Sequence, residues 1–252
     1  MSRFLVLIPV FNAIKSVDKV FYECSKLVSN KELKILIADN CSTDGTYEVL
    51  SQKIIGQELT NNKITIRQNT RNLGLGGSLK FNMINNIKHY DWILIAHGDG
   101  QGDIYKICTN FIDTIKINPE LNYIMASRFH KDANLEGYNR LRILANKALN
   151  LFSRIILNIC ISDFGCGIIA IKTEVIDGLN FESLKDDFMF NPELNVRIAS
   201  NPKIAWKEVL LDWKDSMNPS NVSVISHTMS FLRYVIRFRI NRNGGLDGVF
   251  DK

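Results

Sequence analysis

Short apolar runs alternate with segments in which apolar residues recur every three or four positions. One segment with helical spacing runs from Val17 to Val28, and a second follows Gly77 and ends at about Ile87. The apolar runs between these segments have the length of buried strands and lie at residues 3–8, 33–38, 63–67 and 91–96. This order of strands and helices predicts an α/β protein with a mostly parallel, Rossmann-like sheet covered by helices.

The second half of the chain keeps both element types but is less regular. A strand at 121–126 precedes a long helix from about Asn139 to Ile159. The apolar side of that helix is formed by Leu141, Leu144, Ala148, Leu151, Phe152, Ile155 and Ile156. Further strands are expected at 168–171 and 204–211, and further helices at 193–199 and 222–240. No break in composition marks a linker, which favours one folded domain.

Polar or acidic turns follow three of the first four predicted strands. The turn after 91–96 reads His97-Gly98-Asp99-Gly100-Gln101-Gly102-Asp103. Ligands bind at the carboxyl ends of the strands in open α/β sheets, so these turns are expected to form one site. Asp103 is expected to cap the next helix, whereas Asp99 stands between two glycines. An unhindered carboxylate suits Mg²⁺ or Mn²⁺, and such ions usually bring phosphate oxygens with them.

Composition limits the class of protein further. The chain has 252 residues, of which 46% are hydrophobic and 23% charged, as in an ordinary soluble domain. A net charge of +5 suits anionic ligands or a membrane surface but is too small to indicate nucleic acid. Five scattered cysteines without a CxxC pair indicate reduced thiols in a cytoplasmic protein. Neither a signal peptide nor a membrane-spanning run is expected.

Seven motifs occur in an order that resembles the inverting family-2 glycosyltransferases of GT-A fold. They are IPVFN at 8–12, ADNCSTDGT at 38–46, NLGLGGSLK at 72–80, HGDGQGD at 97–103, ASRF at 126–129, SDFGCGIIAIK at 162–172 and FMFNPELNVRI at 188–198. The chain is most similar there to the dolichol- and polyprenyl-phosphate sugar synthases, over roughly residues 4–211. The resemblance implies a GT-A domain over residues 1–221 and a C-terminal helical tail over 222–252.

The resemblance also implies that a nucleotide-sugar donor binds on the early turns. The residues expected to bind the donor are Pro9, Phe11, Asn12, Asp39, Asp44, Gly74 and Gly98. Asp39 would contact the base, because a carboxylate accepts N–H hydrogen bonds well, and Asp44 would fix its turn. Other phosphate-binding loops are not favoured, because no GK[ST] follows the glycines and they do not follow the first strand.

The HGDGQGD turn takes the place of the metal motif of that family. Asp99 matches the second carboxylate of the motif, and Gln101 matches a residue that lies beside the metal. His97 stands where the family usually has a carboxylate. It either binds Mg²⁺ or Mn²⁺ through a ring nitrogen or packs within the fold, and both interpretations stay open here.

Two kinds of acceptor are compatible with these motifs. A lipid phosphate is already anionic and needs cations, which the resemblance assigns to Arg128, Arg140 and Arg142. A saccharide hydroxyl, as in polysaccharide synthesis, needs a general base instead. The candidates for that base are Asp163, then Asp187 and Glu193. Each of these charged side chains has a structural or surface role as its alternative.

The predicted helix at 222–240 has an apolar face and four arginines towards its end. They are Arg233, Arg237, Arg239 and Arg242. This helix either lies on an anionic membrane surface, as peripheral contact at the inner face, or packs on the domain with its arginines near the negative end of the helix dipole. The segment Lys214–Asn221 departs from the basic motif that the family tends to have there, which weakens the lipid-phosphate assignment.

Two other classes of protein stand as alternatives. A nucleotidyltransferase also combines a Rossmann-like sheet with a carboxylate-bound metal. It normally needs a basic glycine-rich loop directly after the first strand, and PVFNA is not one. A non-catalytic relative would have lost its metal site through His97. The sequence favours no particular oligomeric state.

Overall fold

The computed structural model describes residues 2–56, 63–214 and 224–243. The segment 215–221, where the chain departs from the family's basic motif, lies outside the described residues. Residues 244–252 of the expected tail and the side chain of Arg242 lie outside them too.

The described residues contain nine strands, and seven of them lie close to the predicted positions. The nine are β1 (Phe4–Val10), β2 (Leu33–Asp39), β3 (Ile64–Gln68), β4 (Trp92–Ile95), β5 (Tyr123–Ser127), β6 (Leu135–Glu136), β7 (Ile169–Lys172), β8 (Trp206–Leu210) and β9 (Trp213–Lys214). The two strands that the apolar pattern did not predict, β6 and β9, are two residues long and pair with each other.

Eight α-helices in the described part of the chain connect or cover these strands. They are α1 (Val17–Leu27), α2 (Thr46–Ile55), α3 (Gly74–Ile84), α4 (Ile104–Ile117), α5 (Arg140–Leu157), α6 (Thr173–Gly178), α7 (Phe190–Ser200) and α8 (Val224–Asn243). Two short 3₁₀ turns, Ile14–Ser16 and Phe181–Ser183, complete the described elements.

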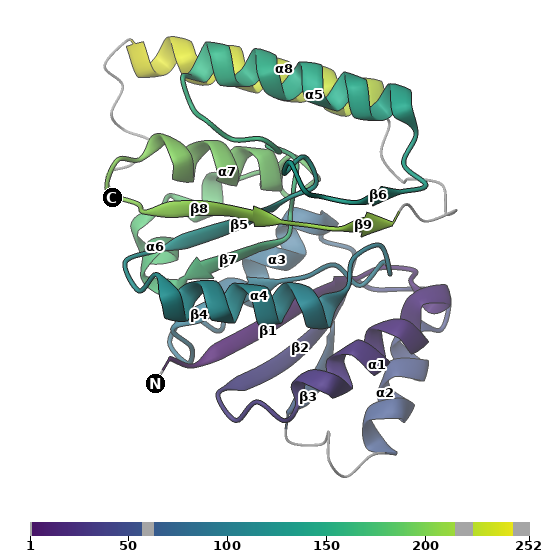
Figure 1. Ribbon diagram of the computed structural model, residues 1–252. Coiled ribbons are helices and arrows are strands. Elements are labelled where there is room, and N and C mark those ends of the chain that lie inside the picture. Colours follow the sequence, from purple (N-terminus) through teal and green to yellow (C-terminus); the bar gives the residue numbers. More distant parts are fainter. Residues whose placement is uncertain (1, 57–62, 215–223, 244–252) are drawn as a thin grey trace.

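The seven longer strands form one sheet in the order β3-β2-β1-β4-β7-β5-β8 (Figure 1). All of them run parallel except β7, which is antiparallel to β4 and β5. The predicted mostly parallel sheet is therefore confirmed. The carboxyl ends of β1, β2 and β4 are neighbours at one edge, so the turns that follow them meet there.

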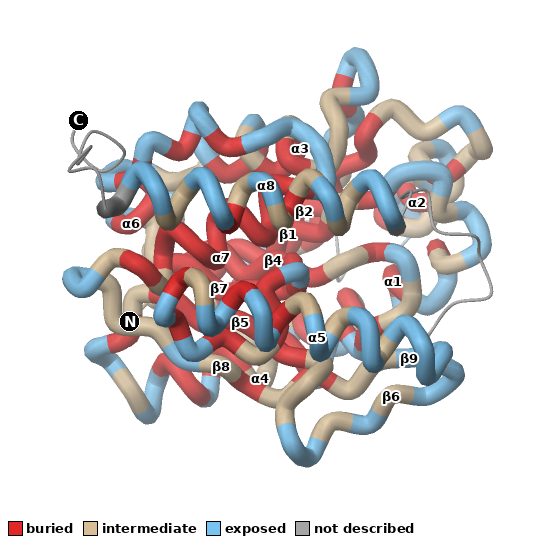
Figure 2. Tube along the Cα trace, turned by 90° about the horizontal axis from the view of Figure 1, so that it is seen from above, coloured by how far each residue is buried: buried red, intermediate tan, exposed pale blue. Residues whose placement is uncertain are grey.

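Two apolar layers hold the sheet between helices. Phe4, Val6 and Ile8 face one side, where they pack with residues of α1, α2 and α4. Leu5 and Leu7 face the other side, where they pack with α3 and α7. Successive strand residues point to opposite faces, so one apolar strand serves both layers. Burial is accordingly concentrated in the strands and in the inner faces of these helices (Figure 2).

Helices α5 and α8 form an outer pair, side by side, beyond the second layer (Figures 1 and 2). Phe231 and Val235 of α8 are buried in the second core, and the Phe231 ring lies 5.8 Å from that of Phe164. The inner face of the C-terminal helix thus packs on the domain. The predicted apolar side of α5 exists, but it faces away from the sheet, with Leu141 76% exposed. In the part of the chain that the structure describes, no helix has the length and apolar character required to span a bilayer.

Candidate active site

The turns after β1 and β2 are joined by hydrogen bonds between them. The amide of Asn12 donates to Ser42 Oγ, and Asn12 Oδ1 accepts from the amide of Thr43, both at 2.9 Å. Asn12 has a φ of 48°, a left-handed conformation that asparagine tolerates better than most residues. Phe11, beside it, is 38% exposed, and Pro9 is half-buried at the end of β1. The turn predicted to hold the donor is therefore shaped before any ligand arrives.

Asp39 and Asp44 are the fixed points of this arrangement. Asp39 is fully buried, and its carboxylate accepts hydrogen bonds from Ser42 and from Gln68 Nε2. Asp44 accepts from the amides of Ile14 and Thr46. Partial burial raises the pKa of Asp44, but the hydrogen bonds from Thr46 and Ile14 outweigh that effect and lower it. The hydrogen bonds of Asp44 fix the turn after β2, as expected. Asp39 is buried beneath the same turn.

Gly98 joins the third turn to the first. Its amide donates to the carbonyl of Pro9, and a Cβ at this position would lie 2.4 Å from Val10 Cγ1. The absence of a side chain lets the β4 turn lie directly on the end of β1. Gly98 therefore supports the predicted donor site through backbone packing.

Gly74 packs against a distant stretch of backbone. A Cβ on Gly74 would lie 2.4 Å from the carbonyl oxygen of Asp186, and one on Gly76 would lie 2.2 Å from that of Lys185. The amide of Gly77 donates to the Asp186 carbonyl at 3.0 Å. These glycines make room for the backbone at 185–186, more than 100 positions away, and the donor contact expected of Gly74 stays a prediction.

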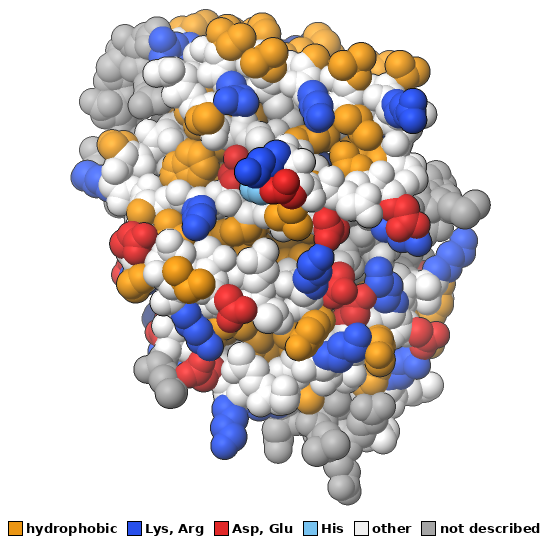
Figure 3. Space-filling model, viewed as in Figure 1, with side chains coloured by type: hydrophobic (Ala, Val, Ile, Leu, Met, Phe, Trp, Pro, Cys, Tyr) orange, Lys and Arg blue, Asp and Glu red, His pale blue; other side chains and the backbone are white. Residues whose placement is uncertain are grey.

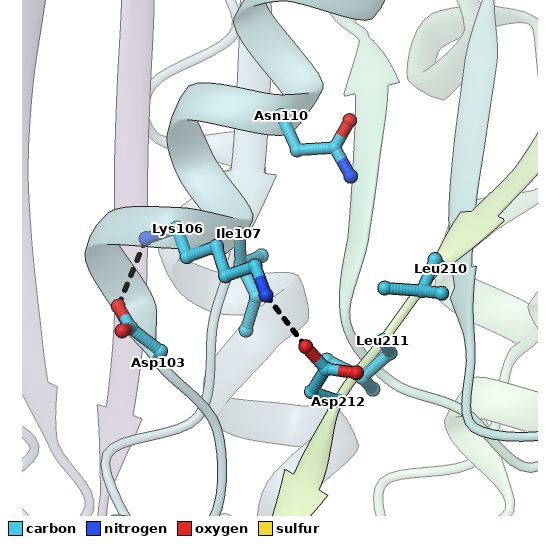
Figure 4. A pocket seen from close by; sticks show the side chains of 7 residues that line it. All are labelled: Asp103, Lys106, Ile107, Asn110, Leu210, Leu211 and Asp212. Atoms are coloured by element: carbon cyan, nitrogen blue, oxygen red, sulfur yellow. Dashed lines mark hydrogen bonds and ion pairs between the residues drawn. The ribbon is translucent and has the colours of Figure 1, made fainter. Parts of the chain in front are cut away.

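Asp99 and Asp103 occupy the same turn but differ in environment. Asp99 is exposed at the carboxyl end of β4, and its Oδ1 accepts from the amide of Gln101 at 3.0 Å. Asp103 is the N-cap of α4 and accepts from the amide of Lys106, which confirms the predicted cap (Figure 4). Asp99 is left with carboxylate lone pairs directed towards solvent.

His97 is half-buried at the start of the turn. Its Nε2 is buried and has no hydrogen-bond partner within the described residues, and a Cβ on Gly167 would lie 2.9 Å from it. Burial lowers the pKa of His97, an effect that the Asp99 carboxylate opposes and that Arg128 adds to. His97 therefore favours the packing interpretation as a neutral side chain. Asp99 and Arg128 are therefore both close enough to affect the charge of His97.

The residues at this edge can supply part of a metal site. Within residues 2–56, 63–214 and 224–243, no three His, Cys, Asp or Glu side chains gather closely enough to hold an ion by themselves. Asp99 fits a hard cation, with Gln101 adjacent in the same turn. A cation there would need oxygen ligands from a bound diphosphate and from water, as Mg²⁺ commonly does.

Arg128 and Asp163 form a buried pair across 35 residues of sequence. Nε and Nη2 of Arg128 donate to the two carboxylate oxygens at 2.7 and 2.9 Å, and the side chains are 17% and 2% exposed. Burial alone would lower the pKa of Arg128, but Asp163 raises it above its ordinary value, so the guanidinium stays charged. A carboxylate held in this way argues against Asp163 as a general base, and that assignment stays a prediction.

The remaining candidates are dispersed. Glu193 is buried on α7, where its carboxylate accepts from the amide of Lys185, and burial raises its pKa. Asp187 is exposed and accepts from the amide of Met189. Arg140 and Arg142 are exposed in the first turn of α5. The structure thus joins Arg128 with Asp163 but places the other two arginines on a separate element.

Several residues around Arg128 were not anticipated from the sequence. Ser162 donates from its amide and hydroxyl to Glu208 Oε1, and its Oγ also pairs with that of Ser127. Trp213 lies 5.4 Å from the Arg128 guanidinium, in cation–π contact. These contacts join β5, β8 and the 162–163 turn. The only hint in the sequence is an acidic residue inside the strand predicted at 204–211.

A small cavity beside the α4 cap has a different character. Asp103, Lys106 and Asp212 line it, and Lys106 Nζ pairs with Asp212 across it (Figure 4). Its volume of about 30 Å³ matches a single water rather than a nucleotide. The open edge above β1, β2 and β4 is the better candidate for the donor.

Comparison with known proteins adds a family and a fold. The model of the family described as glycosyl transferase family 2 matches residues 5–177. The polyprenol monophosphomannose synthase of Mycolicibacterium smegmatis is 21% identical over 212 residues, which cover 79% of this chain and 73% of that protein.

Two similar solved structures share the whole architecture. Glucosyl-3-phosphoglycerate synthase from Mycobacterium tuberculosis, in complex with phosphoglyceric acid, has a TM-score of 0.66 at 15% identity and covers 96% of this chain and 80% of its own. Mannosyl-3-phosphoglycerate synthase from Rubrobacter xylanophilus has a TM-score of 0.65 at 14% identity, with 98% and 76% covered. These likenesses confirm the predicted GT-A fold.

The family match covers more than half of the chain and includes the β1, β2 and β4 turns. It decides against the nucleotidyltransferase and the non-catalytic relative. The chain belongs to glycosyl transferase family 2 and is a nucleotide-sugar-dependent glycosyltransferase.

Proposed function

We propose that this enzyme transfers a hexosyl group, with inversion and with a divalent cation, from a nucleotide sugar to the phosphate of a polyprenyl-type lipid. The observation that carries the proposal is the state of Asp163, whose two carboxylate oxygens are both held by Arg128. With its first base candidate engaged and Glu193 buried, the site suits an acceptor that is already anionic. A phosphate monoester is such an acceptor.

The donor is proposed to lie over the turns of β1, β2 and β4. The 9–12 turn and the Asp39–Asp44 turn hold the nucleotide, and their mutual hydrogen bonds keep both in one shape. Preorganised turns of this kind lower the ordering cost of binding. Asp39 orders the turn from below, and contact with the base requires its side chain to become accessible.

A cation held by Asp99, with Gln101 beside it, would neutralise the charge that builds on the departing diphosphate. Either Mg²⁺ or Mn²⁺ suits such oxygen ligands. One structure of the M. tuberculosis glucosyl-3-phosphoglycerate synthase, with a TM-score of 0.63 at 14% identity, is a complex with Mn²⁺, UDP and glucosyl-3-phosphoglycerate. This supports a divalent ion as the cofactor of the proposed reaction.

In the proposed reaction, an acceptor phosphate oxygen attacks the anomeric carbon from the face opposite the diphosphate. The new carbon–oxygen bond forms as the bond to the diphosphate breaks, the nucleoside diphosphate leaves with that electron pair, and no proton is transferred. Arg128 supplies fixed positive charge at the end of β5, and Arg140 and Arg142 supply exposed guanidinium groups for the acceptor phosphate. The named relatives support a phosphate-bearing acceptor, because their names describe polyprenol monophosphate and phosphoglycerate products.

A saccharide hydroxyl acceptor is the second candidate, and Asp187 favours it. Asp187 is the one exposed carboxylate among the three base candidates, and it adjoins the 185–186 backbone that packs on Gly74. In that reaction Asp187 would accept the hydroxyl proton as the sugar bond forms.

A panel that varies the donor, the metal ion and the acceptor tests these candidates. UDP-, GDP- and CDP-sugars are each combined with Mg²⁺ or Mn²⁺ and with a polyprenyl phosphate, 3-phosphoglycerate or an oligosaccharide, and products are identified by mass spectrometry. The expected product is a polyprenyl phosphosugar with inverted anomeric configuration by NMR. Transfer to 3-phosphoglycerate alone would remove the lipid from the proposal, and the linkage by NMR would show whether its phosphate or its hydroxyl had attacked. Transfer only to a sugar hydroxyl, with loss of activity in Asp187→Asn, would replace the proposal by its alternative.

A further inference from the structure

Helix α5 exposes much of its apolar surface. Its buried residues are Asn150, Ser153 and Leu157, and Asn150 Oδ1 accepts from the amide of Phe164. Leu157 packs in the second core, but five large apolar side chains of the helix are exposed, with Leu141 at 76% and Ile155 at 71%. A helix that buries amides and hydroxyls while exposing leucines is expected to meet an apolar environment on its outer side.

Helix α8 extends this exposed surface. It uses Phe231 and Val235 to pack on the domain and leaves a second apolar stripe facing outward. The two stripes consist of Leu141, Leu144, Leu151, Phe152 and Ile155 on α5 and Ile225, Met229, Ile236 and Ile240 on α8. These nine residues, called the α5–α8 face, are half of the eighteen exposed large apolar residues in the described part of the chain. Apolar side chains line the corresponding upper edge of the molecule (Figure 3).

The charge on these two helices has a single sign. Neither sequence contains an Asp or a Glu, and together they carry eight basic residues, more than the whole chain's net charge of +5. Arg140, Lys147 and Arg154 recur every seven positions, so they follow one line along α5 beside its apolar stripe. All three side chains are exposed. An apolar stripe flanked by cations is the pattern of a helix that lies in a bilayer interface.

Charge also distinguishes between the occupants of the face. In a two-fold dimer the α5–α8 face would meet its own copy, and the basic residues of one chain would oppose those of the other. An anionic lipid surface has the complementary charge and accepts the apolar side chains between its head groups. We propose that the α5–α8 face docks the enzyme on an anionic bilayer. Its role in catalysis rests on the proposed lipid-phosphate acceptor.

The docked orientation would bring the acceptor side of the site to the lipid. Arg140 and Arg142 open α5, and residues 129–139 connect that helix to Arg128 at the end of β5. A lipid phosphate in the bilayer surface would therefore meet these arginines at the point where α5 enters the interface. The donor turns after β1 and β2 belong to other elements and stay open to water-soluble nucleotide sugar.

Flotation of the full chain with vesicles tests the docking. The vesicles contain phosphatidylcholine alone or with about 30% phosphatidylglycerol, and no nucleotide sugar is present. We expect the bound-to-free ratio to be about tenfold higher on the anionic vesicles and to fall with added salt. Leu144→Glu/Ile155→Glu should lower it by about tenfold or more, because both side chains would have to enter the apolar interface.

Matched variants elsewhere serve as controls. Ile55→Glu/Ile117→Glu changes two side chains that are 76% and 77% exposed on other helices, and it should bind vesicles as the wild type does. Absence of flotation by the wild type, or equal loss in this control, would overturn the docking. So would a dimer in light scattering without vesicles that Leu144→Glu/Ile155→Glu dissociates, because the face would then join two copies. Vesicle binding is measured without transfer, so failure of the proposed reaction leaves this result separate.

Discussion

The donor turns and the α5–α8 face differ in what their side chains contact. After β1 and β2, the side chains of Asn12, Ser42 and Asp44 satisfy backbone amides of the neighbouring turn. On α5, Asn150 and Ser153 face inward beside Leu157, while Leu141, Leu144 and Leu151 are exposed. The first region is complete without a partner, and the second acquires an ordinary amphipathic environment only when something apolar covers it.

The two regions also differ in charge. Carboxylates at Asp39, Asp44 and Asp99 characterise the donor turns, whereas α5 and α8 carry only basic residues. This division suits a cation-assisted donor on one side and an anionic acceptor on the other. The Arg128–Asp163 pair lies between them, close enough to His97 for its charge to lower the pKa there.

The largest effect on the donor side is expected from substitutions in the β4 turn, where Asp99 and Asp103 have different roles. Asp99→Asn removes the exposed carboxylate that would hold the cation, and kcat/KM should fall by about 10³-fold in a transfer assay with Mn²⁺. The melting temperature should stay the same, because Asp99 makes a single hydrogen bond within its own turn.

Asp103→Ala provides the opposite pattern. Loss of the α4 cap should lower the free energy of unfolding by about 1 kcal/mol and leave transfer near the wild-type level. If Asp99→Asn retained normal turnover, the assignment of the metal to this turn would fail.

Breaking the Arg128–Asp163 pair should lower the stability of the fold. Asp163→Asn leaves the Arg128 guanidinium buried with a neutral partner, and the free energy of unfolding should fall by about 3–5 kcal/mol in urea denaturation. Asp187→Asn, at an exposed position, should change it by less than about 0.5 kcal/mol. Unchanged stability in Asp163→Asn together with lost transfer would instead return Asp163 to the role of general base.

Substitution of Gly76, which follows β3, tests the packing of this segment against the backbone at 185–186. Gly76→Ala places a Cβ at 2.2 Å from the Lys185 carbonyl oxygen, and we expect a loss of about 1–3 kcal/mol in unfolding free energy. Gly178→Ala is the control, because nothing lies within 4 Å of a Cβ there and its effect should be within about 0.5 kcal/mol. Equal effects of both substitutions would show that the 185–186 backbone does not pack against Gly76.

Features with short sequence range were predictable in this chain. The strands β1, β2 and β4 follow from apolar runs, and the Asp103 cap follows from its position before an apolar helix. Because parallel strands present their carboxyl ends at one edge, the meeting of the three turns also follows.

Features that depend on distant partners were not predictable. Arg128 meets a carboxylate 35 positions away, and Gly76 meets a backbone carbonyl more than 100 positions away. The antiparallel direction of β7 leaves no mark in its apolar pattern. The stripe on α5 was visible, but periodicity gives the angle of an apolar face on the helix and not what that face meets.

The smallest expected effect concerns Glu208, which contacts the 162–163 turn beside Arg128. Burial raises the pKa of Glu208, although hydrogen bonds from Ser162 partly oppose this. The ionised form is thus disfavoured in the fold, so the wild type loses stability as pH rises from the ordinary value of 4.5 through the raised pKa. Glu208→Gln cannot ionise and should equal the wild type at about pH 4 but be more stable than the wild type at about pH 8.

Urea denaturation of both proteins across this pH range measures the difference. Glu208→Ala separates charge from hydrogen bonding, because it also deprives the Ser162 amide and hydroxyl of their acceptor and should be less stable at every pH. A difference between Glu208→Gln and wild type that did not vary with pH would show that the carboxylate is equally solvated in the folded and unfolded chain. The contacts between Glu208 and the 162–163 turn would then leave the carboxylate accessible to water in the folded protein.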